Sequence, residues 1–206
     1  MKQIAQRMHS LGTESAFEVL AKAKNLEAQG KHVIHLEIGQ PDFPTPPHIC
    51  AAAFQAMQQG YTGYGPADGL IELRTAISEH ISTTRQIEVE ADEVVVTPGA
   101  KPIIFFTLLA LVDRGDEVIY PDPGFPVYES VINFVGAKPV PLPLREEAEF
   151  RFRIDDLSDA ISERTKLLIV NSPQNPTGGL LKLEDLEAIA HLANQHDFYV
   201  LSDEIY

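Results

Sequence analysis

Residues 167–179 read LLIVNSPQNPTGG, and this stretch gives the strongest indication of the architecture. Its first four residues are apolar without interruption, whereas the following nine contain two prolines, two asparagines and two glycines. A short apolar run without polar alternation is typical of a strand in a sheet that is covered on both faces. We expect the polar loop to lie at the carboxyl end of that strand, where α/β sheets bind their ligands.

Further short apolar runs lie on either side of this stretch and alternate with segments of helical periodicity. Strands that alternate with helices predict an α/β fold in which helices cover both faces of the sheet. The expected architecture is a three-layer α/β/α sandwich with a mostly parallel, mixed sheet. The other expected strands are 94–96, 117–120 and 198–201, and the expected helices between them are 101–112, 127–134 and 183–195.

The amino-terminal part of the chain is predicted to be mainly helical. Apolar residues recur at helical spacing in 15–29 and 70–82, and Pro46 and Pro47 suit the first turn of an alanine-rich helix that runs to about Gln59. A short strand is expected at 33–38. Cys50 is the only cysteine, so an intrachain disulfide is excluded, and we expect it to be a small buried side chain on the alanine-rich helix.

Composition and charge narrow the classes of function. The chain has 206 residues, 44% of them hydrophobic, which is enough for a buried core in one large or two small domains. Its formal net charge of −14 would repel a phosphate backbone, so no nucleic-acid partner is expected. No segment approaches the ~18 apolar residues of a membrane span, and the start of the chain lacks the apolar stretch of a secretory signal. We expect a soluble, cytoplasmic protein without a membrane partner.

Three segments are suited to bind a small anionic ligand, although each also has an ordinary structural explanation. The turn TPGAKP at 97–102 precedes a helix whose N-terminus would attract an anion, or it is only a tight turn. Asn175 offers an amide that can donate to a phenolate oxygen or a carboxylate, and its bond to Pro176 is a candidate for the cis form, or the loop merely turns. Asp203 follows an apolar strand and needs a partner: a helix N-terminus, a salt bridge or a cationic ring nitrogen.

Other kinds of site are not indicated. Neither the dinucleotide-binding glycine motif nor the P-loop motif occurs in the chain. His32 and His35 lie on opposite faces of the expected strand, and His191 and His196 lack the spacing of a helical metal pair. The acidic cluster at 146–149 is expected to be a solvated loop. No metal site is therefore predicted.

Taken together, the motifs resemble those of the class I and II aminotransferases, which are pyridoxal 5'-phosphate (PLP) enzymes of fold type I. The similarity is greatest to the aspartate aminotransferase branch and extends from Gly39 to Tyr206. Six motifs occur in the family order: GQPDF at 39–43, the segment 61–74, TPGAK at 97–101, YPDPGF at 120–125, NPTG at 175–178 and SDEIY at 202–206.

The resemblance implies roles for residues around the cofactor. Gly99, Ala100 and Lys101 would form the phosphate cup, chiefly through main-chain N–H groups. Phe125 would stack on the pyridine ring, at a position where many relatives carry Tyr or Trp. Asp203 would pair with the protonated ring nitrogen and so make the ring an electron sink.

Further roles implied by the resemblance concern the phenolic oxygen of the cofactor, the substrate and the partner subunit. Asn175 and Tyr206 would both hydrogen-bond the phenolic oxygen, and Asn175 also counts as a substrate-binding residue. Gly39 would lie close to the substrate carboxylate. Tyr64 would reach the phosphate of the neighbouring subunit, which implies a homodimer with shared active sites.

No catalytic residue is assigned within the chain. The Schiff-base lysine of the family is expected beyond Tyr206, and Lys101 is rejected for that role because it matches the phosphate site. We expect residues 1–45 to contribute to the small domain and 46–206 to form the amino-terminal part of the large PLP-binding domain. The 206 residues alone are expected to be inactive.

The parent enzyme is expected to move an amino group between an amino acid and a 2-oxo acid. Two alternatives stay open at this point. One is a PLP-dependent carbon–sulfur β-lyase of the same fold, and the other is a domain that senses PLP without turnover. Most of the residues that select the amino acid are expected beyond Tyr206, so acidic, aromatic and aliphatic amino acids all stay open as substrates.

Overall fold

The computed structural model describes residues 3–12 and 15–206, and these divide into two units. The sheet unit contains the leader up to Ser15 together with Gly99–Tyr206, and the helical unit contains Ala16–Pro98. In the leader, the 3₁₀ helix η1 (Gln6–Ser10) contacts helix α5, and Gly12 N–H donates to Ser130 Oγ at 2.9 Å.

Four parallel strands form the sheet, in the spatial order β2-β1-β3-β4. The expected strands at 117–120, 167–170 and 198–201 are confirmed in this sheet. No antiparallel strand pairs with it among the described residues of the sheet unit. The bounds are Glu117–Asp122 for β1, Lys138–Pro143 for β2, Thr165–Asn171 for β3 and Tyr199–Asp203 for β4.

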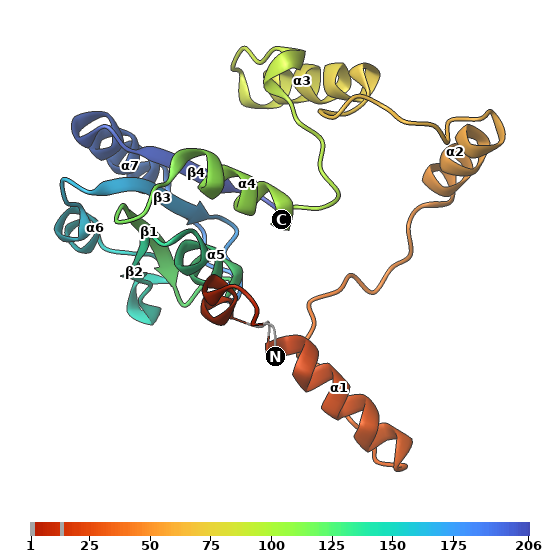
Figure 1. Ribbon diagram of the computed structural model, residues 1–206, viewed down its shortest axis with the longest axis horizontal. Helices are drawn as coiled ribbons and strands as arrows, with labels where there is room; N and C mark the ends of the chain where they lie inside the picture. Colours follow the sequence, from red (N-terminus) through yellow and green to blue (C-terminus); the bar gives the residue numbers. More distant parts are fainter. Residues whose placement is uncertain (1–2, 13–14) are drawn as a thin grey trace. The chain divides into compact units, whose positions relative to one another are not determined.

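Alternate side chains of the central strands enter two different hydrophobic clusters, as a sheet that is covered on both faces requires. Leu167 and Ile169 pack in the cluster with helices α4 and α5, whereas Leu168 and Val170 pack in the cluster with α6 and α7. Figure 1 shows the sheet between these two pairs of helices, so the three-layer α/β/α architecture is confirmed. The helices span Lys101–Leu111 (α4), Val127–Val135 (α5), Ile154–Ala160 (α6) and Leu183–His196 (α7), with a 3₁₀ turn at Glu146–Ala148.

Strand β2 was not predicted, because its sequence KPVPLP contains three prolines. Proline cannot donate to a β ladder and is tolerated at a sheet edge when its nitrogen faces outward. Lys138 N–H donates to Asp116 O at 2.8 Å and Leu144 N–H donates to Asp122 O at 2.7 Å, so the even-numbered positions face β1. The prolines occupy the odd-numbered positions of an edge strand, where no donor is needed.

The helical unit contains three helices, α1 (Ser15–Ala28, beginning at the boundary residue), α2 (Pro47–Gln58) and α3 (Ile71–Arg85), and a 3₁₀ turn at Ala91–Glu93. The expected strands at 33–38 and 94–96 are wrong, since neither segment is a strand in the structure. A strand needs a neighbour to satisfy its backbone, and Val96 N–H instead donates to Asp68 O in a loop at 2.9 Å. Within the described residues, no helix has the length and apolar character needed to cross a membrane.

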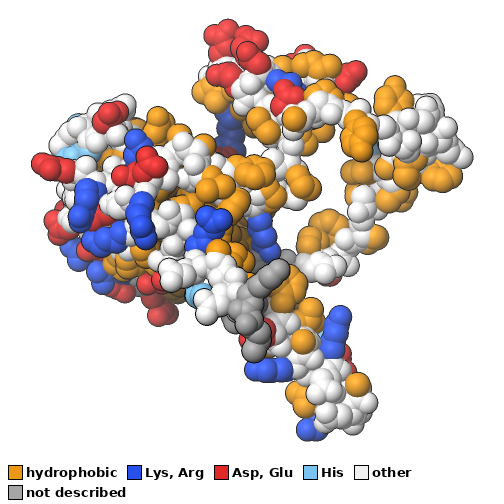
Figure 2. All heavy atoms as spheres, in the orientation of Figure 1, with side chains coloured by type: hydrophobic (Ala, Val, Ile, Leu, Met, Phe, Trp, Pro, Cys, Tyr) orange, Lys and Arg blue, Asp and Glu red, His pale blue; other side chains and the backbone are white. Residues whose placement is uncertain are grey.

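Cys50 is exposed, which contradicts the expectation that it is buried. The reason lies in its helix: none of the described residues of α2 is buried, and neither α1 nor α3 of the helical unit packs closely over its apolar side chains. The exposed hydrophobic residues of α2 include Ile49, Phe54 and Met57. Figure 2 shows hydrophobic side chains at the surface of this helix.

Candidate active site

The carboxyl end of β4 and the beginning of helix α4 border a cavity of about 230 Å³ in the sheet unit. Asp203 is the last residue of β4 and lines this cavity, as do Ala100 and Ile103 at the start of α4. The structure therefore brings together two of the segments to which the sequence analysis assigned ligand binding, 97–102 and 202–206.

The beginning of helix α4 favours an anion. Gly99 has φ +93°, a left-handed conformation that side chains other than glycine rarely adopt, and the chain enters the helix directly after it. The helix has no side-chain cap and no acidic residue in its first turn, so no carboxylate of its own offsets the positive end of its dipole. Lys101 adds a positive charge, and its Nζ lies 5.9 Å from the centre of the Phe125 ring.

The loop after β1 places an aromatic ring beside this helix end. An added Cβ at Gly124 would lie 2.2 Å from the carbonyl oxygen of Pro121, so the tight path of the loop requires glycine. Phe125 follows, and its ring meets the ring of Tyr128 edge to face, with centroids 5.7 Å apart and an interplanar angle of 85°.

The hydrogen-bond partner of Asp203 is a tyrosine, Tyr128, which was not among the expected partners. The Tyr128 hydroxyl donates to Asp203 Oδ2 at 2.6 Å, and Ile205 N–H donates to Oδ1 at the longer distance of 3.3 Å. No Lys or Arg pairs with Asp203 in the part of the chain that the structure describes. Burial of the phenol, followed by the hydrogen bond to Asp203, raises the pKa of Tyr128 far above its ordinary value, so the hydroxyl stays a neutral donor.

The loop after β3 is held by two buried amide side chains. Asn171 donates from Nδ2 to Asp203 O at 2.9 Å and accepts from Asn175 N–H at 2.7 Å. Gln174 donates from Nε2 to Pro123 O and to Asn175 O, each at 2.8 Å, while its Oε1 accepts from Thr177. The loop is thereby tied to the ends of both β4 and β1.

Asn175 lies between these anchors and is half-buried. Its bond to Pro176 is cis, as the sequence analysis expected. Its side-chain amide makes no hydrogen bond to any described residue, so it has both donors and its acceptor available for a ligand.

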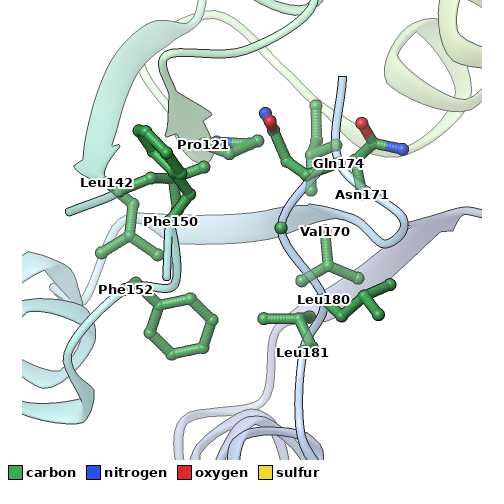
Figure 3. A pocket seen from close by; sticks show the side chains of 12 residues that line it. Pro121, Leu142, Phe150, Phe152, Val170, Asn171, Gln174, Leu180 and Leu181 are labelled. Carbon is green, nitrogen blue, oxygen red and sulfur yellow. The ribbon is translucent and has the colours of Figure 1, made fainter. Parts of the chain in front are cut away.

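A second, smaller pocket lies under the same loop and is shown in Figure 3. Its volume of about 20 Å³ is close to the minimum for one water molecule, and its lining is mostly apolar. Figure 3 shows the amide ends of Asn171 and Gln174 turned away from Phe152 and Leu181. This pocket is a gap in the packing under the loop, and the larger cavity beside Asp203 is the candidate ligand site.

After burial and the interactions with Asp203, the phenol of Tyr206 also contributes to raising the pKa of Tyr128, so Tyr206 lies near this network. Tyr206 is 66% exposed and follows Asp203 by three residues. Gly39 and Tyr64 belong to the helical unit and are exposed, so their assigned roles stay predictions.

Sequence reasoning missed Tyr128, Asn171 and Gln174 as parts of the site. The aromatic pair Phe125 and Tyr128, three residues apart at the start of a helix, was an available signal for the first. Asn171 and Gln174 belong to the polar loop that was singled out, but only the three-dimensional structure shows that their side chains are buried.

A parallel sheet covered on both faces, with an uncapped helix N-terminus and a carboxylate beside one cavity, defines an α/β protein with a candidate small-ligand site at its strand ends. Residues 31–206 match the family described as aminotransferase class I and II. The chain belongs to this family.

Individual relatives agree with this assignment. The chain is 38% identical over 205 residues to a probable aspartate/prephenate aminotransferase of Aquifex aeolicus, covering 100% of this chain and 52% of the relative. It is also similar to the structure of an aspartate aminotransferase of Thermus thermophilus with maleate, with a TM-score of 0.97 and 40% identity over 100% of this chain and 54% of the other. An alanine aminotransferase of Pyrococcus furiosus gives a TM-score of 0.94 and 36% identity over 99% of this chain and 52% of the other. The chain thus spans about half the length of these relatives.

Proposed function

We propose that the protein to which these residues belong is a PLP-dependent aminotransferase that moves an amino group between an amino acid and a 2-oxo acid. The observation that carries the proposal is the Asp203 carboxylate, which is held by a buried tyrosine and lines a cavity beside the uncapped end of α4. Such a cavity offers an anion-attracting end and a carboxylate acceptor, as a phosphorylated pyridinium requires.

The residues present fit PLP in their chemistry. Gly99, Ala100 and Lys101 would hold the phosphate at the start of α4, and Phe125 presents an aromatic ring beside Lys101. Asp203 keeps acceptor capacity on Oδ1 for a ring N–H, since that atom receives only one long hydrogen bond. When bound, PLP supplies an electron-withdrawing ring that stabilises negative charge at the α-carbon of an amino acid.

The phenolic oxygen of the cofactor would be bound by Asn175, whose amide is available, and by Tyr206. We also assign Asn175 and Gly39 to the substrate. Further assignments are proposals of the same kind. Tyr64 would reach the phosphate in the partner subunit of a homodimer with shared sites. Residues 1–45 would belong to the small domain and 46–206 to the large domain of a cytoplasmic protein. They are supported by the resemblance of the motifs.

Neither alternative function is favoured, because the relatives described above are named aminotransferases. Their names differ in the amino acid, which is aspartate in one and alanine in another. We therefore propose the substrate class only as amino acids and 2-oxo acids.

The cofactor cradle is tested with pyridoxamine 5'-phosphate, which has no aldehyde and so cannot react with surface lysines. We expect the chain to bind it more tightly than pyridoxamine, which lacks the phosphate, in a calorimetric titration. Lys101→Ala should weaken binding of the phosphorylated ligand about tenfold and leave pyridoxamine binding nearly unchanged, because it removes one charge near the phosphate. Equal affinity for the two ligands would contradict the cradle.

Lys166→Ala is the matched control. Like Lys101, Lys166 lies over an aromatic ring, but that ring belongs to Tyr199 at the start of β4, away from the strand ends that form the site.

The reaction class is tested on the full-length protein that contains these residues. Formation of a 2-oxo acid from aspartate, alanine or phenylalanine with 2-oxoglutarate supports an aminotransferase. Pyruvate and ammonia from cystathionine, without amino transfer, would support the lyase instead.

A further inference from the structure

Tyr128 contacts both Asp203 and Phe125, the two residues that we propose to bind the cofactor ring. Its hydroxyl donates to Asp203 Oδ2 at 2.6 Å, and its ring meets the Phe125 ring edge to face. These partners come from the end of β4 and from the loop before α5, which are 75 and three residues away from Tyr128 in the sequence. One side chain therefore fixes the relative position of the predicted stacking ring and the predicted partner of the ring nitrogen.

Tyr128 is itself held rigidly. Its side chain is 0% exposed, and it is part of the hydrophobic cluster that α4 and α5 form with the sheet, together with Leu167 and Ile169. A ring packed on all sides has one rotamer available, so its hydroxyl has one position. That position lies within hydrogen-bond distance of Asp203.

The main chain of Asp203 is held as well. Asn171 is the register partner of Asp203 between β3 and β4, and its Nδ2 donates to Asp203 O at 2.9 Å. With the backbone and Oδ2 both restrained, the direction of Oδ1 is also set. Oδ1 receives only the 3.3 Å hydrogen bond from Ile205 N–H and keeps a lone pair for another donor.

We propose that Tyr128 is a positioning residue, which holds the Asp203 carboxylate so that Oδ1 pairs with the cationic ring nitrogen of the bound cofactor. This inference rests on the proposed function of the same site. Without the hydroxyl, the carboxylate rotates about its own bonds and must lose that freedom when the ring binds, which weakens the pairing.

A merely structural hydrogen bond would affect stability without affecting the ring nitrogen. The test therefore reads that atom directly, by ¹⁵N NMR of ring-labelled pyridoxamine 5'-phosphate at one fixed pH near 7.5, and measures the ligand's dissociation constant by calorimetry. The variants are Tyr128→Phe, Asp203→Asn and the double variant of the 206-residue chain. Tyr199→Phe is the matched control, because it removes a hydroxyl from an exposed tyrosine in the same strand as Asp203.

In the unmodified chain we expect the ¹⁵N signal at the position of a protonated ring. Tyr128→Phe should move it toward the neutral position and weaken binding about tenfold, as expected for the loss of a charge-assisted hydrogen bond. In the Asp203→Asn background, the same substitution should change affinity less than twofold, because Tyr128 acts through Asp203. Tyr199→Phe should match the unmodified chain.

An unchanged ¹⁵N signal in Tyr128→Phe, or an equal effect of that substitution with and without Asp203, would overturn the positioning role while leaving the cofactor site intact. Failure of the unmodified chain to bind the ligand would overturn the proposed cradle and this role with it.

If Tyr128→Phe does not fold, 3-fluorotyrosine at position 128 replaces it and keeps the hydroxyl. The fluorinated phenol is a stronger donor and should move the ¹⁵N signal, whereas fluorination at Tyr199 should not; an unmoved signal would also overturn the proposal.

Discussion

The Arg151 guanidinium binds the Asp185 carboxylate through two hydrogen bonds, Nε to Oδ2 and Nη2 to Oδ1, both 2.7 Å long. Asp185 is 1% exposed and also accepts from Lys182 N–H at 2.8 Å, so it caps the first turn of α7. Burial alone would raise the pKa of Asp185, but Arg151 and the Lys182 N–H outweigh it and lower the pKa. The pair thus fastens the loop that contains Arg151 to the helix on one face of the sheet.

Arg151→Met is expected to lower the free energy of unfolding by about 3 kcal/mol, because it leaves a buried carboxylate without its counter-charge. Urea unfolding at pH 7 measures this loss. Arg153→Met is the matched control, since Arg153 and Asp155 are exposed and Arg153 Nη2 lies 3.8 Å from Asp155 Oδ2. We expect that change to stay within about 0.5 kcal/mol; equal losses in the two variants would refute the role of the buried pair.

At the opposite end of the sheet from the site, the Glu117 carboxylate joins β1 to β2 and to the segment before β3. It accepts from Ser162 Oγ at 2.7 Å, from Lys138 Nζ at 3.0 Å and from Arg164 Nη2 at 2.7 Å. These donors, led by Ser162, lower the pKa of Glu117 from 4.5 to about 2.

A depressed carboxylate pKa stabilises the folded state above the ordinary pKa and loses that effect as the pH falls. The contribution of Glu117 should therefore be complete above about pH 5 and vanish as the pH falls from 4.5 to about 2. We expect Glu117→Gln to cost on the order of 2 kcal/mol at pH 7, after allowance for the exposure of Lys138 and Arg164, and progressively less at pH 4 and 3. Urea unfolding at each pH measures the free-energy cost of Glu117→Gln, with Glu163→Gln, at an exposed glutamate nearby in the sequence, as the control. A cost of Glu117→Gln that does not change with pH would contradict a stabilising role of the ionised Glu117 carboxylate.

Periodicity predicted the parts of the fold in which local pattern and tertiary environment agree. The apolar runs at 167–170 and 198–201 are strands because each has a parallel neighbour to satisfy its backbone. The run at 94–96 is also apolar throughout but is not a strand, since Val96 N–H donates to Asp68 O in a loop instead. Strand β2 shows the reverse: its prolines argue against a strand, and only its place at the sheet edge makes them acceptable.

The candidate site was predicted to a similar extent and for a similar reason. Lys101, Phe125 and Asp203 lie in motifs that are continuous in sequence, so they could be singled out one by one. The Tyr128 hydroxyl reaches Asp203 across 75 residues, and no local pattern predicts that contact. Cys50 was expected to be buried because its helix is apolar, but composition does not reveal whether another element covers a helix.

Gly124 permits the close approach of the loop to the end of β1. Gly124→Ala is expected to cost about 2–4 kcal/mol, because its Cβ would lie 2.2 Å from the Pro121 carbonyl oxygen and the backbone must move. The shift displaces Phe125, so affinity for pyridoxamine 5'-phosphate should fall as well. Gly63→Ala is the control, as no heavy atom lies within 4 Å of its added Cβ. If both variants unfold at the same urea concentration as the unmodified chain, the close approach does not matter.

The Gln174 side chain joins the loop after β3 to the loop after β1. Its loss should lower the stability of this loop more than the stability of the sheet. Met has nearly the same length and volume but no polar atoms, so Gln174→Met leaves Pro123 O without this donor and Thr177 N–H without its acceptor. Both groups are only partly buried, so leaving each one unpaired costs on the order of 1 kcal/mol.

Amide hydrogen exchange of the segment 172–182 is the direct measurement for this variant. Thr177 N–H bonds to the Gln174 side chain and Gly178 N–H to the Gln174 carbonyl oxygen at 2.8 Å, so both are protected only while the loop is closed. We expect exchange there to accelerate at least tenfold, because even 1.4 kcal/mol of lost local stability has that effect, while strand β3 stays protected. Gln195→Met, an exposed glutamine near the end of α7, should leave the segment unchanged. Exchange that rises equally in β3 and in the loop would mean that Gln174 supports the whole sheet and not the loop that carries Asn175.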